Sequence, residues 1–464
     1  MFDLSTSTAT DAMVALSAGH LSSVELLDAM VQRVDRFNPA LNAVVALDVD
    51  RARSRARAAD EARARGETWG RLHGLPMSIK DIFATEGLVT TSGHVPFANF
   101  VPDADAAPVA ALKRAGAIVF AKTNLPEFGG DIQSYNGIHG VCRNPWNPER
   151  TSGGSSGGSA VALATGMSVL ELGSDIGGSI RVPCHYNGVY GHKATYGAID
   201  EFGEIPLPSG WTHAPVDLVV AGPMGRCVAD LSLGLDVLTS AAVGGVPGAA
   251  LPPASPRALS ARGLRVGVWV DDPAAPTSNE IKAAIRAVAK LMADYGAVVS
   301  ETGGPGPSLD EQNLLYQQLL SAAMLSPRSQ ALTHREWMAA NERRHRLIAA
   351  YQRFFTEVDV VLAPIAPTTA FTHRTEGALN ERTLTVDGAE VPYLRHLVWA
   401  GLATLPGLPS TAVPIGRSTE GLPIGMQIIG PKWGDRTTIA VAGMVESLIG
   451  GFVPPPGYGS ANAS

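Results

Sequence analysis

The sequence is poor in cysteine and in charged residues, and each shortage argues against a class of protein. Its three cysteines, Cys142, Cys184 and Cys227, are too few for a disulfide framework, although they leave room for one bridge. No pair of them has metal-ligand spacing, so we expect no metal and a reducing compartment. Charged residues make up 17% of the chain and the net charge is −7. This balance argues against a nucleic-acid partner.

Long apolar runs are absent as well. No uninterrupted apolar run reaches about 18 residues, the length that a membrane-spanning helix needs. The chain begins Met1-Phe2-Asp3-Leu4 and lacks the basic segment and apolar core of a secretion signal. The sequence therefore predicts a cytoplasmic protein without a membrane partner.

Glycine and proline are abundant instead. The chain has 50 glycines and 33 prolines, which together with the low charge indicates a large buried interior connected by many turns. Its 464 residues would allow two or three average domains, but a large sheet enzyme can use that length in one. We predict a single domain, made of N-terminal helices (1–70), a core (71–240), a connection (241–263) and a second half (264–464).

Hydrophobic periodicity predicts alternating helices and strands. Residues 7–65 have the pattern of two or three helices, and residues 74–130 alternate short apolar runs with helical ones. This order is typical of a layered α/β fold. The Pro/Gly/Trp-containing stretch 200–216 is long enough to wall an active site. We expect residues 370–392 to be irregular and the tail after Pro454 to be loose.

The rest of the chain is organised around residues 153–181, GGSSGGSAVALATGMSVLELGSDIGGSIR. Two serine-bearing glycine turns, 153–159 and 175–179, flank an apolar run that can pack as a helix and a strand. Glycine suits positions with positive φ or a close approach to the backbone, so these turns indicate a site built from main-chain N–H groups. A flexible Ser/Gly linker is the alternative, but the buried-type residues 161–164 between the turns argue against it.

This stretch resembles the signature of the amidase signature family, serine hydrolases that use a serine, a second serine on a cis peptide and a lysine. The resemblance covers nearly the whole chain. Further matching blocks are GLPMSIKD at 74–81, AKTNLPEF at 121–128, NPWNP at 144–148, GHKATYG at 191–197 and GLPIGMQ at 421–427. It implies an α/β fold with a large central mixed β-sheet covered by helices on both faces, and no cofactor.

Carried over by motif, the resemblance implies that Ser179 is the nucleophile, Ser155 the bridging serine and Lys80 the base. A serine hydroxyl needs a neighbour that removes its proton, and a lysine can do so only when neutral. The apolar residues around Lys80 make a buried, neutral amine credible. An exposed surface lysine is the ordinary alternative.

The resemblance also assigns supporting roles. The main-chain N–H groups of the second turn would receive the oxyanion; they belong to Ile176, Gly177, Gly178 and Ser179. Ser156 is a hydrogen-bonding candidate beside the site. Asp175 and Arg181 flank the nucleophile and would brace the turn, a role that a purely structural ion pair would also explain.

Other catalytic schemes fit less well. The chain has no Gly-x-Ser-x-Gly elbow between a buried strand and a helix, so we interpret His185 and His192 as packing or hydrogen-bonding residues. Cys184 follows the nucleophile closely, but a small buried residue is expected there. No His-Glu-x-x-His or paired-cysteine motif indicates a metal, and Gly153 to Ser159 lacks the ending of a phosphate loop.

We therefore expect a hydrolase of carboxylic amide C–N bonds, with aryl or apolar amides, carbamates (urethanes) and esters as substrates, acting as a monomer or homodimer. An amidotransferase subunit that hydrolyses glutamine in a complex and a non-catalytic family member are the alternatives. Five residues are candidates for the substrate pocket, with core packing as the alternative for each: Trp211, Tyr316, Met324, Trp337 and Trp399. Departures from the family pattern, such as His192-Lys193-Ala194 in place of Leu-Lys-Pro, leave the substrate open.

Overall fold

The main β-sheet contains strands from both halves of the chain. A computed structural model of the protein describes residues 2–204, 216–240, 251–324 and 332–459. In it, eleven strands form one sheet in the order β1-β3-β2-β6-β8-β7-β14-β15-β11-β9-β10. In that order the strands are Val44–Leu47, Ile118–Thr123, Pro76–Lys80, Glu171–Asp175, Val220–Gly225, Tyr190–Lys193, Ser410–Arg417, Pro423–Ile429, Val360–Pro364, Arg265–Val268 and Val298–Glu301.

The sheet is mixed. Parallel pairing joins β3 to β2 and β2 to β6 near one end, and β11 to β9 and β9 to β10 at the other. The strands between β6 and β11 pair antiparallel with their neighbours. The predicted mixed α/β sheet is thus confirmed, and β7 to β14 is the pair that joins the two halves of the chain.

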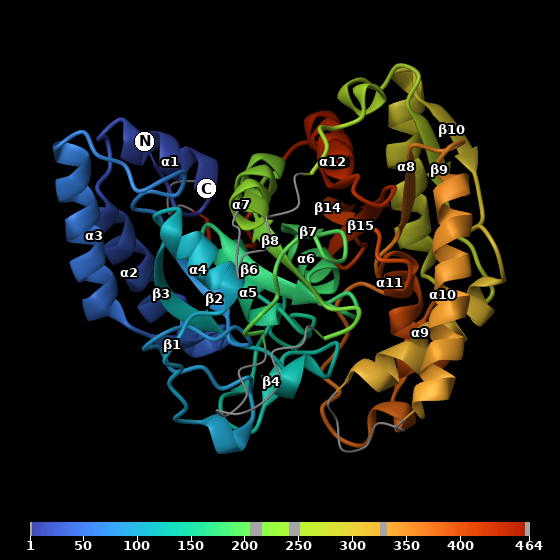
Figure 1. Ribbon diagram of the computed structural model, residues 1–464, viewed down its shortest axis with the longest axis horizontal. Coiled ribbons are helices and arrows are strands. Elements are labelled where there is room, and N and C mark those ends of the chain that lie inside the picture. The colour runs from blue at the N-terminus through green and yellow to red at the C-terminus, as the bar shows by residue number, and fades with distance from the viewer. Residues whose placement is uncertain (1, 205–215, 241–250, 325–331, 460–464) are drawn as a thin grey trace.

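Helices surround the sheet (Figure 1). Those labelled α1 to α3 lie at one end, and α8 to α10 lie at the other. In chain order, α1 to α12 are Ala9–Ser17, Ser23–Leu41, Val49–Ala64, Ala107–Arg114, Gly157–Thr165, Arg181–Asn187, Val228–Ser240, Asn279–Asp294, Leu309–Ala323, His334–Phe354, Leu397–Thr404 and Asp435–Ile449. Two-stranded pairs, Tyr135–Asn136 with Gly140–Val141 (β4 and β5) and Thr383–Val386 with Ala389–Pro392 (β12 and β13), lie outside the main sheet.

Two apolar clusters occupy the two faces of the sheet. Along β11, Val360 and Leu362 belong to one cluster while Val361 and Ala363 belong to the other, as expected when successive side chains point to opposite faces. The first cluster includes side chains of α7, α8 and α12, and the second includes those of α6, α9, α10 and α11. The sheet is therefore covered by helices on both faces, as predicted.

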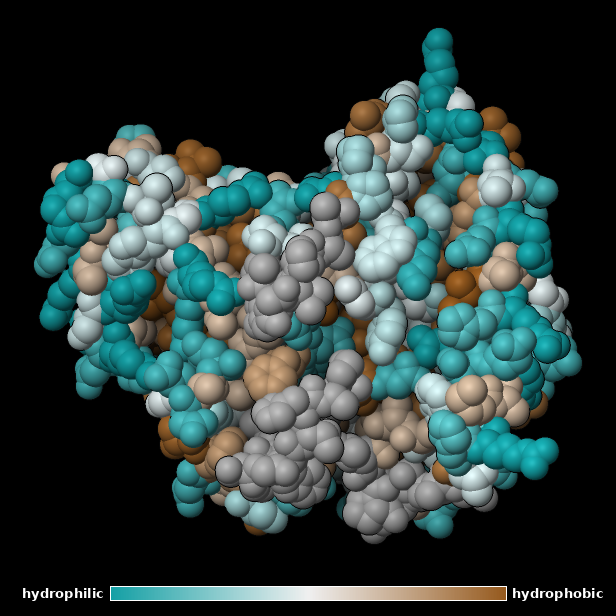
Figure 2. Space-filling model, viewed as in Figure 1, coloured by the Kyte–Doolittle hydropathy of each residue, from teal (hydrophilic) through white to brown (hydrophobic). Residues whose placement is uncertain are grey.

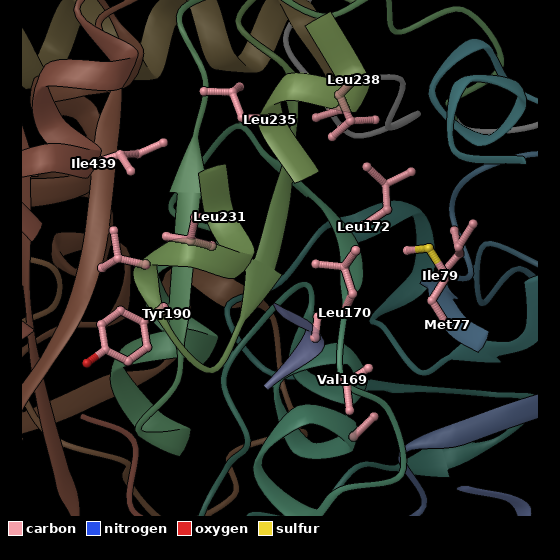
Figure 3. Close-up of a cluster of buried hydrophobic side chains, with 14 of the residues drawn as sticks. Met77, Ile79, Val169, Leu170, Leu172, Tyr190, Leu231, Leu235, Leu238 and Ile439 are labelled. Atoms are coloured by element: carbon pink, nitrogen blue, oxygen red, sulfur yellow. The ribbon is translucent and has the colours of Figure 1, made fainter. Parts of the chain in front are cut away.

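Figure 3 shows part of the first cluster, where leucines of α7 meet residues of β2 and β6 and the segment before β6. The labelled side chains are Met77, Ile79, Val169, Leu170, Leu172, Tyr190, Leu231, Leu235, Leu238 and Ile439. Every residue of β2 and β6 is buried, so these two strands are held rigidly. Hydrophilic side chains cover the outer helices at both ends of the face seen in Figure 2.

Several helices begin at a capping box, in which a Ser or Thr side chain and an acidic side chain three residues later satisfy each other's backbone N–H groups. Ser22 with Glu25 caps α2 in this way, and Thr333 with Glu336 caps α10. Within the described ranges, no helix is long and apolar enough to cross a membrane.

The expectation that residues 370–392 are irregular is wrong for the second part of that stretch. Residues 383–392 form the β12–β13 hairpin, in which Thr383 pairs with Pro392 and Val386 with Ala389. The turn residues Asp387 and Gly388 both have positive φ, at 48° and 83°. Asp-Gly is a strong signal for this kind of two-residue hairpin turn, and it identifies the hairpin from sequence.

The tail after Pro454 is also more ordered than expected as far as residue 459. The Tyr458 ring lies 4.8 Å from the Phe37 ring, and Arg33 Nη2 donates to the Tyr458 carbonyl at 2.7 Å. These contacts attach the tail to α2. The predicted connection 241–263 and the predicted loop 200–216 fall partly on residues 241–250 and 205–215, which lie outside the described residues.

Candidate active site

Two parallel strands bring the predicted site residues to one edge of the sheet. Lys80 is the last residue of β2, and Asp175 is the last residue of the neighbouring β6. The register pairs Ser78 with Glu171 and Ile79 with Leu172, so the strands run side by side and β6 extends two residues beyond the end of β2. Polar groups at the carboxyl ends of parallel strands face a common crevice, which is where ligands bind in open α/β sheets.

Lys80 is fully buried and hydrogen-bonded to two hydroxyl groups. Its Nζ donates to Ser155 Oγ at 2.6 Å and to Ser174 Oγ at 2.9 Å. Burial lowers the pKa of Lys80 to about 8, although the nearby carboxylates of Glu204 and Asp175 act in the opposite direction. A measurable fraction of the amine is therefore neutral near pH 7, the form that can accept a proton.

The first glycine turn places Ser155 against Lys80. The peptide bond between Gly154 and Ser155 is cis, as the family resemblance implies. A side chain at residue 154 would come within 2.5 Å of the Gln133 backbone nitrogen, so only glycine fits there. A Cβ on Gly129 would lie 3.2 Å from Ser155 Oγ, which shows how closely that residue borders the serine.

Ser179 lies beside the same turn. The backbone N–H of Ser156 donates to the Ser179 carbonyl at 3.1 Å, which fixes the two glycine turns against each other. The Ser156 hydroxyl donates at 3.4 Å to the carbonyl of Ser174. Ser179 is 6% exposed and Ser155 2% exposed, so the two predicted catalytic serines lie in a nearly closed site.

Asp175 and Arg181 form a buried ion pair inside the second turn. Arg181 donates from Nη2 to Asp175 Oδ1 at 2.8 Å and from Nε to Oδ2 at 3.0 Å, a two-pronged contact. Burial alone would raise the pKa of Asp175, but the Arg181 guanidinium lowers it to about 2. Asp175 also accepts the backbone N–H groups of Gly178 and Ile180, at 3.0 and 3.1 Å. The pair therefore holds the shape of the turn that carries Ser179.

Arg181 also ties this turn to the second half of the chain. Its guanidinium donates to the Ala400 carbonyl of α11, to Thr404 Oγ1 and to Gln427 Oε1 of β15, at 3.1, 3.0 and 2.8 Å. The Gln427 amide in turn donates to the Pro364 and Trp399 carbonyls. These bonds fix α6 and the turn before it against α11 and the centre of the sheet.

One of the four predicted oxyanion donors is already engaged. The Gly178 N–H points to the Asp175 carboxylate and not to an open site. Gly178 has a φ of 92°, which glycine adopts readily, so its role is to allow the turn. The N–H groups of Ile176, Gly177 and Ser179 are left as the candidate donors.

The structure places His185, His192 and Cys184 in packing or hydrogen-bonding positions. The imidazole of His185 accepts the Gly425 N–H at 2.6 Å, and burial lowers its pKa to about 4. His192 lies between Thr411 and Asp435, at the base of α12. Burial raises the pKa of the Cys184 thiol well above its usual range, and all three cysteines are free. A thiol nucleophile at Cys184 is therefore disfavoured.

The predicted pocket residues are distributed between the site and the core. Tyr316 is fully buried, and its hydroxyl donates to the Ile176 carbonyl at 2.6 Å, so it contacts the turn from below the surface. Met324, at the end of α9, has its Cε 3.9 Å from the Cβ position of Gly130. Trp399 is buried in the core, where its indole donates to Thr277. Trp337 is half-buried against the second cluster, and Trp211 lies outside the described residues.

Three neighbours of the site were not identified from sequence as site residues: Ser174, Glu204 and Gly129. Ser174 alternates with Asp175 on β6, so its position next to the turn is a signal that sequence analysis could use. Gly129 directly follows the matching block 121–128, and Glu204 lies in the stretch 200–216 that was expected to wall the site, but neither belongs to a motif, and they meet Ser155 and Lys80 through the fold. No group of three or more metal-ligating side chains occurs in the part of the chain that is described.

Solved structures with this fold are amidase signature enzymes. A bacterial aryl acylamidase of that family matches with a TM-score of 0.83 and 24% identity, over 96% of both chains. A 6-aminohexanoate cyclic dimer hydrolase complexed with substrate matches with a TM-score of 0.82 and 25% identity, over 98% of this chain and 100% of that one. The chain therefore has the fold of amidase signature enzymes.

The sequence leads to the same class. The family model described as Amidase matches residues 25–333 and 320–439, and the chain belongs to this family. It is 33% identical to the A subunit of the glutamyl-tRNA(Gln) amidotransferase of Roseiflexus sp. (strain RS-1), over 94% of both chains. It is 32% identical to an indoleacetamide hydrolase of Bradyrhizobium diazoefficiens, over 95% of this chain and 86% of the relative.

Proposed function

We propose that the protein hydrolyses carboxylic amides through an acyl-enzyme on Ser179, with Ser155 as the proton-transfer residue and Lys80 as the base. The observation that carries the proposal is the 2.6 Å contact between Lys80 Nζ and Ser155 Oγ in a fully buried position. A neutral amine has two N–H groups and one lone pair. It can therefore donate to Ser174 while it accepts the proton of Ser155.

The proton then moves along two hydroxyl groups. Lys80 takes the Ser155 proton as Ser155 takes the proton of Ser179, whose oxygen attacks the carbonyl carbon. The resulting tetrahedral oxyanion is stabilised by main-chain N–H groups of Ile176, Gly177 and Ser179; one such donor is worth roughly 3 to 4 kcal/mol in other hydrolases. Ser155 returns a proton to the leaving nitrogen, the C–N bond breaks, and water releases the acyl group from Ser179.

The substrates that we propose are aryl or apolar amides, with carbamates and esters as further substrates. A carbamate carbonyl passes through the same kind of tetrahedral state, so the same groups serve it. The similar proteins include an aryl acylamidase and an indoleacetamide hydrolase, which supports an aromatic group on the amide. Parallel assays with an anilide, a primary aryl amide and an aryl carbamate would rank the three classes.

Covalent capture tests the nucleophile directly. A fluorophosphonate probe should attach to Ser179 in the native protein, as read by peptide mass, and Ser179→Ala should lose both the label and turnover. Because the residues of such a site act as a unit, we expect a loss on the order of 10⁶ in kcat. Ser168→Ala is the matched control, since Ser168 is a buried serine that bonds Leu170 and Ser78 away from the site. Unchanged turnover in Ser179→Ala would refute the proposal and favour a non-catalytic role.

Glutamine hydrolysis within a complex is the second candidate, because several relatives are A subunits of amidotransferases. Such a protein shares the predicted residues but supplies ammonia to a partner. The isolated protein separates the two functions: turnover of aryl amides without glutaminase activity supports the first, and glutaminase activity that appears only with amidotransferase partner proteins supports the second.

A further inference from the structure

A third ionisable group adjoins Lys80 and has no part in the mechanism above. Glu204 forms an antiparallel bridge with Phe83, just beyond the end of β2. Its carboxyl group lies close enough to Lys80 and Ser174 for each of them to lower its pKa. The Ser174 hydroxyl accepts from Lys80 Nζ at 2.9 Å, and a side-chain hydrogen bond with Ser174 lowers the pKa of Glu204. Lys80, Ser174 and Glu204 thus form a series of interacting side chains that leads away from Ser155.

The carboxyl group of Glu204 is only partly satisfied. Its Oε2 is buried and has no hydrogen-bond partner among the described residues. A buried oxygen without a partner is costly, so it needs an explanation beyond packing. An electrostatic role next to a buried lysine supplies one, because an opposite charge within a few ångströms favours the charged form of each group.

We propose that Glu204 is a positioning residue for Lys80: through Ser174 it holds the amine in reach of Ser155 and sets the pH at which the amine loses its proton. This inference rests on the proposed function of Lys80 as the base. It assigns a role to a residue outside the signature motifs, and it makes Ser174 the link between the base and its counter-charge.

The charged groups around these three side chains decide in which direction Glu204 changes the pH at which Lys80 loses its proton. Two ionisable groups face Glu204: Lys80 at the end of β2, and Glu201 in the same turn as Glu204. Lys80 is also faced by Asp175 of β6. Glu201 is also faced by Lys193 of β7. Burial raises the pKa of Glu201 well above its usual range and that of Glu204 to about 7. A negative charge on Glu204 favours the protonated amine, and its removal must let Lys80 lose its proton at lower pH.

The rate at which a fluorophosphonate labels Ser179, measured against pH, tests this inference. In the wild type the rate rises as Lys80 becomes neutral. In Glu204→Gln we expect this rise to move to lower pH by about one unit or more. Glu204→Asp keeps the charge at a greater distance from Ser174 and should give an intermediate shift. Glu201→Gln is the matched control: it alters a carboxyl group three residues away that is not among the charges acting on Lys80, and it should leave the profile in place.

A purely structural role would change the labelling rate without moving its pH dependence. Coincident profiles for the wild type and Glu204→Gln would therefore overturn the inference. If Glu204→Gln does not fold, Glu204→Asp carries the same test, since an unmoved profile there also counts against it.

A second measurement separates this inference from the proposed function. The chain has only seven lysines, so the side-chain carbon signal of Lys80 can be assigned in lysine-labelled protein by substitution. Its titration should move to lower pH in Glu204→Gln. A labelled Ser179 with an unmoved Lys80 titration overturns the Glu204 inference alone. A wild type in which Ser179 is never labelled refutes the proposed function, while the lysine titration still decides whether Glu204 acts on Lys80.

Discussion

Two buried lysines on adjacent strands differ in what they face. Lys80 ends β2, and Lys122 lies near the end of β3, where it pairs in register with Ile79. Both are fully buried, and burial lowers the pKa of each to about 8. Lys80 bonds two serine hydroxyls of the glycine turns and β6. Lys122 bonds the Phe83 carbonyl and Thr85 Oγ1, on a segment without a nucleophile.

The comparison teaches that burial and a lowered pKa do not by themselves identify a base. Lys122 lies near Asp81 and Glu171, and it donates to the Phe83 carbonyl and to the Thr85 hydroxyl, whose own proton goes to that same carbonyl and not to a serine of the glycine turns. It ties the segment after β2 to β3. Lys80 differs because one of its partners, Ser155, carries a hydroxyl proton and adjoins the turn that contains Ser179.

Within the comparison of the two lysines, the largest expected effect comes from removing each amine in turn. Lys80→Met should lower kcat by roughly 10²- to 10⁴-fold, because proton transfer to a positioned base is lost. Lys122→Met should retain most of the turnover but lower the free energy of unfolding by about 3 kcal/mol, since Asp81 loses its buried counter-charge. Steady-state kinetics and urea unfolding of both variants measure the contrast. Equal losses of activity in the two would break the distinction between the lysines.

The hydroxyl partners of the two lysines give a smaller contrast. Ser155→Ala should lower kcat by roughly 10³-fold, because the proton path between Lys80 and Ser179 is interrupted. Thr85→Val removes the corresponding partner of Lys122 and should cost about 1 kcal/mol of stability, the usual value of one hydrogen bond. Kinetic assays and thermal unfolding of both variants check this. A Ser155→Ala enzyme with near-normal kcat would show that the base reaches Ser179 by another route.

The pH dependence sharpens the comparison further. A protonated amine cannot accept a proton, so kcat/KM should rise about tenfold per pH unit below the Lys80 pKa, which is about 8, and level off above it. The same rise should persist in Lys122→Met, whose missing amine takes no part. Activity profiles of the two proteins across this pKa, from mildly acidic to alkaline buffer, measure this. If the rise of kcat/KM shifts or disappears in Lys122→Met, the titrating group is Lys122 and not Lys80.

The sequence allowed prediction of the residues that carry motifs and the class of fold. Lys80, Ser155 and Ser179 lie in blocks whose glycines and apolar neighbours have a physical reason to be there, and the structure brings Lys80 and Ser155 into contact. The Asp175 and Arg181 pair was likewise expected from its place beside the turn.

The rest depends on contacts between residues that are distant in sequence. Glu204 reaches Lys80 only because its turn pairs with Phe83, and the sequence around Glu204 contains no signal for that pairing. Trp399 is a large aromatic residue of the kind that lines substrate pockets. Tertiary packing instead buries it in the core, where its indole donates to Thr277. The β12–β13 hairpin is different, because the local sequence Asp387-Gly388 predicts its turn.

The continuity of the sheet limits how a substrate can enter. In β7 and β14, residues 191–193 of one half of the chain pair with residues 410–412 of the other, and Arg181 adds side-chain bonds across the same junction. Swinging the halves apart about a hinge would break this ladder and expose the buried guanidinium. Substrate must therefore enter through local movements of connecting segments and side chains, while the sheet itself stays fixed.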